Sequence, residues 1–140
     1  MKLTNFEIED TVTLHYTGLY LDLHNDYDFH EFKYSLSSQV FEIQWDKLET
    51  EETTSNNIDK FKLRFSAVSF LKIQERDAEV PVSEDKCLDV LGWLPQNMRQ
   101  VMDSFGLKPD YKNDDMILIF RGGQTIKINA EQVDLIVLEQ

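Results

Sequence analysis

Apolar and polar residues alternate along several stretches of the chain, which is the pattern of β-strands with one buried face. From Leu19 to Phe29 the odd positions are apolar or aromatic, except for Asn25. After Glu31 the even positions take over as the apolar set and continue to Leu36. Such a change of phase requires a turn, a bulge or a new strand. Asn25-Asp26 is the best local turn candidate.

The next segments predict a long hairpin. "VFEIQW" alternates, the polar tract from Glu49 to Asp59 predicts an exposed loop, and a regular return strand follows. The apolar faces of the two strands are Phe41, Ile43 and Trp45, then Phe61, Leu63 and Phe65. Val68 and Phe70 break the alternation of the return strand, although Leu71 and Ile73 keep it. This break predicts a bulge, a bend between sheets, or burial on both faces.

Helix signals are confined to residues 83–106. Ser83 precedes an acidic first turn, and Cys87, Leu88 and Leu91 follow at helical spacing, which predicts a helix that ends at Gly92. A second helix is predicted from about Pro95 to Phe105, with Gly106 as its stop. Its apolar positions fall at helical intervals: Met98, Val101, Met102 and Phe105.

The end of the chain returns to strands. "MILIF" predicts a strand buried on both faces, "RGGQ" a tight turn, and "TIKIN" the antiparallel partner. "VDLIVLEQ" predicts another strand, with a short helix from Ala130 as the alternative. We therefore expect a single α+β domain over residues 1–140, with a mainly antiparallel sheet of about seven strands, curved or in a sandwich. The two-helix insert precedes the C-terminal hairpin.

Composition narrows the classes of function. The 140 residues include 41% hydrophobic residues, enough for a core, and one cysteine, which cannot form an internal disulfide. No apolar run approaches a membrane span and no secretory signal is visible, so we expect a soluble cytoplasmic protein without membrane contact. The net charge of -12 repels nucleic acid and favours encounter with a basic protein.

The stretch "LHNDYDFHEF" carries the most suggestive set of side chains, His24, Asp26, Asp28 and His30. On one strand face they would offer nitrogen and oxygen ligands to a metal. Neighbours on such a face stand roughly 7 Å apart, however, and the pattern matches no established ligand spacing. We expect a turn or bulge here and no metal or cofactor. Cys87 is expected to be an inert thiol on the apolar side of a helix, so no catalytic residue is predicted.

The second half of the chain carries a resemblance. The succession of "FKLRFSAVSFLKI", "CLDVLGWLP" and "MILIFRGGQTIKINAEQVDLIVLEQ" resembles small uncharacterised bacterial β-rich domains, some grouped with immunity proteins of contact-dependent and polymorphic toxin systems. The resemblance implies a bacterial cytoplasmic protein that binds and neutralises a cognate toxin. It carries over no functional residue.

These observations favour a non-enzymatic protein-binding module, and its sharpest form is immunity to a basic toxin. The expected partner-binding residues are Glu49, Glu51, Glu52 and Asp59 in the polar loop, with Trp93 as an aromatic anchor. One alternative is a small-ligand or metal-dependent enzyme with a site near His24 to His30. Another is a structural or assembly domain. The oligomeric state is left open.

Overall fold

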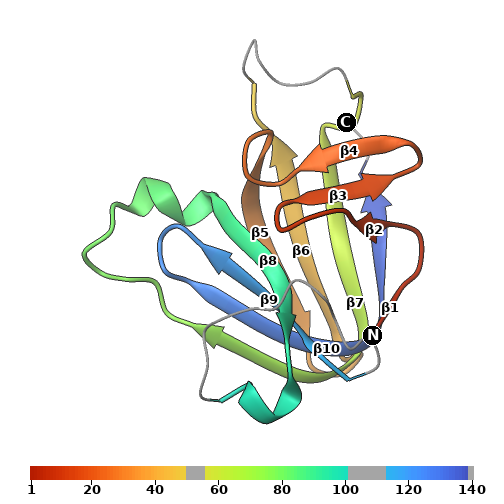
Figure 1. The fold of residues 1–140 in the computed structure, drawn as a ribbon, viewed down its shortest axis with the longest axis vertical. Coiled ribbons are helices and arrows are strands. Elements are labelled where there is room, and N and C mark those ends of the chain that lie inside the picture. Colours follow the sequence, from red (N-terminus) through yellow and green to blue (C-terminus); the bar gives the residue numbers. More distant parts are fainter. Residues whose placement is uncertain (50–55, 101–112, 139–140) are drawn as a thin grey trace.

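A large curled sheet forms most of the protein in this computed structural model, which describes residues 1–49, 56–100 and 113–138. Its strands run in the order β5-β6-β7-β10-β9-β8, with β1 added in parallel to β10 (Figure 1). The strands are β1 (Lys2–Leu3), β5 (Tyr27–Ser35), β6 (Val40–Lys47), β7 (Lys60–Gln74), β8 (Leu88–Leu94), β9 (Asp115–Phe120) and β10 (Thr125–Val137). All pairings in this sheet except β1-β10 are antiparallel.

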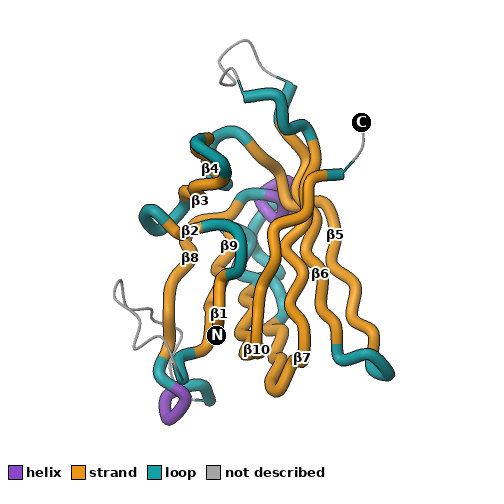
Figure 2. Tube along the Cα trace, turned by 90° about the vertical axis from the view of Figure 1, so that its right-hand side faces the viewer, coloured by secondary structure: helices purple, strands orange, loops and turns teal. Residues whose placement is uncertain are grey.

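A second, three-stranded sheet comes from the start of the chain. It consists of β2 (Glu7–Ile8), β3 (Thr13–Tyr16) and β4 (Leu19–Asp22), paired in that order. Leu14 and Leu21 pair across β3 and β4, and both are fully buried in the same core cluster as the large sheet. The small sheet therefore covers part of the interior that the curled sheet leaves open (Figures 1 and 2).

The curl of the large sheet is built into β7 and β10, which pair along almost their whole length. The first half of β7 pairs with β6, whereas the first half of β10 pairs with β9, so the two long strands link two half-sheets. At the junction Ser69 is an extra residue in β7, and Ala67 has a φ of 54°. Of the alternatives predicted from Val68 and Phe70, the bulge is confirmed. A bulged strand bends and twists more strongly, which favours the curl.

The C-terminal strands correct one prediction and confirm another. β9 is buried on both faces, as "MILIF" predicts, and Arg121-Gly122-Gly123-Gln124 forms the turn to β10. β10 then continues without interruption from Thr125 to Val137. Separate strands or a short helix from Ala130 were therefore wrong, because β7 offers this segment a continuous hydrogen-bonding partner.

The α+β class and the first helix of the insert were also wrong, since the protein is nearly all β. Residues Val82–Lys86 form the short 3-10 turn η1, and the segment that follows is the strand β8. Leu88 pairs with Phe120 and Leu91 with Leu118, because a bulge near Asp89 adds one residue between them. Two interior leucines three residues apart mimic a helical spacing although they lie on a strand.

The second predicted helix is replaced, in its described part, by the 3-10 turn η2 (Gln96–Met98). The remainder of that prediction, residues 101–106, lies outside the described residues. No helix in the described ranges is long and apolar enough to cross a membrane.

Candidate functional site

β5 forms one edge of the curled sheet and contains a bulge. Phe29 pairs with Trp45 and Phe32 with Ile43, so both rings lie on the inner face of the curled sheet although two residues lie between them in sequence. His30 is the extra residue that makes this possible. The change of phase predicted after Glu31 is confirmed as a bulge between Phe29 and Glu31. The predicted turn at Asn25-Asp26 is confirmed too, since residues 23–26 form the turn into β5.

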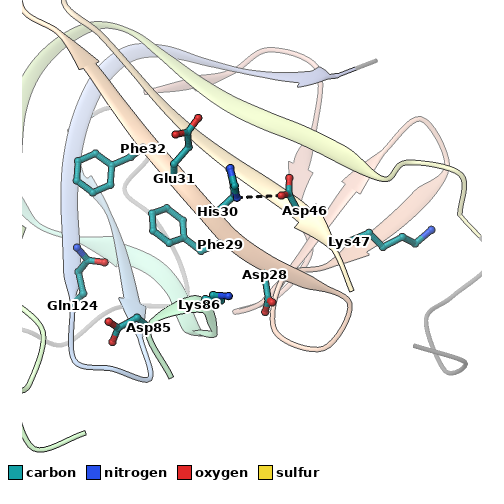
Figure 3. A pocket seen from close by; sticks show the side chains of 10 residues that line it. All are labelled: Asp28, Phe29, His30, Glu31, Phe32, Asp46, Lys47, Asp85, Lys86 and Gln124. Carbon is teal, nitrogen blue, oxygen red and sulfur yellow. Dashed lines mark ion pairs between the residues drawn. The ribbon is translucent and has the colours of Figure 1, made fainter. Parts of the chain in front are cut away.

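A pocket of about 520 Å³ lies between β5 and the segments that face its free edge (Figure 3). We call it the seam pocket. Its lining residues are Asp28, Phe29, His30, Glu31 and Phe32 from β5, Asp46 and Lys47 from β6, Asp85 and Lys86 from η1, and Gln124 from the β9-β10 turn. Phe29 also packs on Phe120, with 4.9 Å between ring centroids, so the pocket has an aromatic floor over the core. Four carboxylates against two amines make it acidic.

Asp28 lies beside a like charge in the seam pocket. It lies directly opposite Asp46 in the β5-β6 pair. Burial raises the pKa of Asp28 and the charge of Asp46 raises it further, although Lys86 acts in the opposite sense. The carboxylate of Asp46 is 3.2 Å from Nδ1 of His30, and Gln44 donates to it as well. Within the described ranges Asp28 has no comparable ion pair, so the pocket holds a carboxylate that a cation would stabilise.

The opposite wall of the seam pocket is held by ion pairs and a close turn. Arg76 donates from Nε to both carboxylate oxygens of Asp85, at 3.0 and 2.8 Å. Gly122 lies so close to Asp85 that a Cβ there would stand 2.1 Å from its Oδ1. Asp77 donates its backbone N–H to the carbonyl of Gly122, at 2.8 Å. This wall is therefore fixed by contacts among η1, the end of β7 and the β9-β10 turn.

Beyond the bulge, the outer edge of β5 has no strand partner among the described residues. The side chains of Phe32, Tyr34 and Leu36 are 36%, 40% and 79% exposed, so apolar surface lies beside an open edge. Such edges are templates for another chain, and natural proteins usually cover or charge them. Among the β5 residues beyond the bulge only Glu31 and Lys33 are charged, and they pair with each other at 3.4 Å.

The four side chains of the suggested metal cluster do not converge. His24 places Nδ1 2.6 Å from the carbonyl of Leu88, Asp26 is buried in the turn, and His30 pairs with Asp46. Only Asp28 and His30 line the seam pocket. In the part of the chain that the structure describes, no group of three or more His, Cys, Asp or Glu side chains is placed to hold a metal ion.

Cys87 follows η1 and does not lie on a helix, which corrects its expected setting. Its Sγ is 3.5 Å from Nδ1 of His24, a spacing that would suit a catalytic pair. Burial raises the pKa of the thiol, and the opposing influence of Arg121 is too weak to reverse this. Since the thiolate is the reactive form, the setting does not activate Cys87.

The structure places three of the five residues expected to bind a partner. Glu49 is exposed, and Asp59 forms a long ion pair with Lys47, at 3.8 Å. Glu51 and Glu52 lie outside the described residues. Trp93 is only 5% exposed because it faces the core from β8, so it cannot anchor a partner at the surface. Sequence reasoning missed Phe32 and Tyr34, although the change of phase that it detected marks the strand that carries them.

Comparisons with protein-family models, with curated proteins and with solved structures gave no match to this chain.

Proposed function

We propose that this chain is a non-enzymatic protein-binding module whose partner contacts the free edge of β5 and the seam pocket. The observation that carries the proposal is the open edge of β5, where Phe32 and Tyr34 are exposed beside unpaired backbone. Exposed aromatic side chains next to a pocket are typical anchors of protein interfaces. A catalytic role has less support, because the one thiol is not activated.

Charge favours a basic partner. The chain carries a net charge of -12, and the seam pocket adds a local excess of carboxylates. Such a field accelerates the encounter with a positively charged protein and weakens as salt is added. Immunity to a basic toxin is the sharpest form of this proposal. It takes as its precedent the bacterial immunity proteins that the second half of the chain resembles.

The test is capture of a partner from the source cell by the immobilised chain, followed by calorimetry with that partner purified. We expect a basic protein whose affinity falls at least tenfold in Tyr34→Ser and falls again as salt is raised. Tyr20→Ser is the matched control, because Tyr20 is 58% exposed but lies on the small sheet. A partner that binds Tyr34→Ser as tightly as the unmodified chain would contradict the proposed surface.

A further inference from the structure

We infer that an extended segment of the basic partner adds to β5 as a further strand, pairing with the backbone of Phe32 and Tyr34. One basic side chain of that segment enters the seam pocket beside Asp28. The inference rests on the proposed function and specifies how the partner is held. This mode of recognition uses main-chain hydrogen bonds for affinity and side-chain pockets for specificity.

The hydrogen-bond directions in β6 establish which β5 residues face outward. Lys47 donates its N–H to the carbonyl of Asp59, on the β7 side, at 2.8 Å. Leu48 donates to the carbonyl of Asp26, on the β5 side, at 2.9 Å. Successive residues of a strand point their N–H and C=O groups to opposite sides. Even-numbered residues of β6 therefore bond to β5, and odd-numbered residues bond to β7.

The same alternation fixes the directions in β5. Glu31 lies opposite Gln44, and Lys33 lies opposite Glu42, so their backbone groups bond inward to β6. Phe32 and Tyr34 occupy the alternate positions, so their N–H and C=O groups point to the free edge. The two residues that present unpaired backbone are also those with exposed aromatic rings. Main-chain bonding and apolar contact are thus available at the same place.

The opposite edge of the large sheet, unlike the β5 edge, is contacted by another segment of the chain. β8 forms that edge, and its Leu91 donates a backbone hydrogen bond of 2.7 Å to the carbonyl of Thr11. The loop before β3 therefore occupies part of the β8 edge. Beyond the bulge, no segment within the described ranges makes a comparable contact with β5. The contrast assigns the addition of a strand to β5 and not to β8.

The seam pocket sets the chemistry of the added segment. From the bulge to Leu36 the free edge has room for about five residues, or roughly 17 Å of strand. Phe32 and Tyr34 suit apolar side chains on one face of that strand. At the bulge the edge meets the seam pocket, where Asp28 lies opposite Asp46 and Lys86 only partly offsets its environment (Figure 3). A lysine or arginine there would bring a positive charge beside Asp28, in a pocket whose lining includes four carboxylates.

The experiment uses random twelve-residue peptides displayed on phage and selected against the intact chain. Enriched peptides are synthesised and titrated into three proteins: the unmodified chain, Tyr34→Ala and Tyr34→Pro. Both substitutions remove the ring, but only proline also removes the outward N–H. We expect alternating apolar residues with an excess of Lys and Arg, and at least tenfold weaker binding to Tyr34→Pro than to Tyr34→Ala. Equal urea midpoints of the two variants establish that both fold alike.

Hydrogen exchange supplies a second readout. Bound peptide should slow exchange of the Phe32 and Tyr34 amides at least tenfold, while the inward amides of Glu31 and Lys33 change little. Equal binding to Tyr34→Ala and Tyr34→Pro, without this protection, would overturn strand addition, as would a failure to enrich any peptide. If peptides are enriched but bind both variants equally, salt-sensitive binding of basic peptides would still support the proposed function.

Two outcomes identify a different occupant or a different function. Light scattering that shows a dimer of the unmodified chain, lost in Tyr34→Pro, would assign the edge to a second copy and overturn the inference. Enriched peptides without an excess of basic residues, bound equally at low and high salt, would contradict the proposed function itself.

Discussion

Arg99 donates from Nε and a terminal nitrogen to the two carboxylate oxygens of Asp115, at 2.9 and 2.6 Å, and Asp115 has no exposed surface. Asn129 donates a third hydrogen bond to the same carboxylate, at 2.9 Å. The guanidinium group also lies 3.9 Å from the centroid of the Phe70 ring. These contacts hold the end of η2 against the face of the sheet that points away from the core.

Removing the guanidinium of Arg99 should show how much its ion pair with Asp115 contributes to the free energy of unfolding. Arg99→Met leaves a buried, uncompensated carboxylate, so we expect a loss of about 3 kcal/mol in the free energy of unfolding. Urea denaturation at pH 7 measures the loss. Arg121→Met is the control, because Arg121 is half exposed and pairs with Glu84 at 3.3 Å. Exposed pairs contribute less than about 1 kcal/mol, so equal losses in the two variants would contradict a special role for Asp115.

Tyr27 should make the free energy of unfolding fall with rising pH in the alkaline range. Burial raises the pKa of its hydroxyl to about 12, against the opposing effect of the contact with Asn56. The hydroxyl also donates to the carbonyl of Ile58, at 2.7 Å. A raised pKa means that stability is fully present below pH 10 and is lost between pH 10 and 12, by about 2 kcal/mol.

The measurement compares the unmodified chain with Tyr27→Phe. Absorbance at 295 nm should show one tyrosine fewer that ionises near pH 12 in the variant. Urea unfolding should show a steeper loss of stability between pH 10 and 12 in the unmodified chain. If stability fell equally with pH in the two proteins, ionisation of the Tyr27 hydroxyl would not be the cause of the loss.

Asp28 should lower stability at neutral pH. Its pKa is raised mainly by burial, so ionisation costs more in the folded chain than in the unfolded chain. Stability is therefore greatest below the unfolded pKa and falls as the pH rises through the folded pKa. Asp28→Asn should raise the free energy of unfolding at pH 7 by about 0.5 kcal/mol, the low end of what optimising a surface charge contributes.

Two comparisons check this prediction. The gain should disappear at a pH low enough to protonate Asp28 in both states, which urea midpoints across the acidic range would show. Asp59→Asn serves as control, since Asp59 is half exposed and has Lys47 nearby. A gain from Asp28→Asn that stays constant at every pH would rule out ionisation as its cause.

Gly122→Ala should disturb one wall of the seam pocket. A methyl group there meets the Asp85 side chain and backbone, so the carboxylate must move and weaken its bonds from Arg76. Overpacking of this kind costs about 1–3 kcal/mol. Gly18→Ala is the control, because a Cβ at Gly18 meets nothing within 4 Å and only its φ of +82° opposes alanine. Adding Asp85→Ser to Gly122→Ala should recover part of the thermal midpoint. No recovery would show that the clash with the Asp85 side chain is not the cause of the lost stability.

The hairpin strands β5, β6 and β7 were predicted from sequence, whereas β8 was mistaken for a helix, and one physical reason explains the difference. Phe29 and Phe32 on β5, like Leu88 and Leu91 on β8, face inward at a separation of three residues across a bulge. A bulge in a strand and one turn of helix give the same local spacing of apolar residues. In β5 the regular alternation on both sides identified a strand, whereas the charged turn before β8 favoured a helix.

The candidate site was predictable only in part. Sequence reasoning located the irregularity between Phe29 and Phe32 but did not point to the free edge of β5, and its proposed anchor Trp93 is buried. The free edge of β5 depends on which strands pair with it, and the seam pocket depends on η1 and Gln124, which are far away in sequence. Local periodicity carries no information about such long-range neighbours.

The parallel pairing of β1 with β10 has a consequence for folding. Lys2 lies opposite Gln132, and Thr4 donates its backbone N–H to the carbonyl of Val133, at 3.0 Å. These contacts join residues about 130 positions apart. Contacts between distant residues slow folding because a long loop must close before they form. During synthesis the large sheet therefore cannot be completed until β10 has left the ribosome, so the first residues wait for nearly the whole chain.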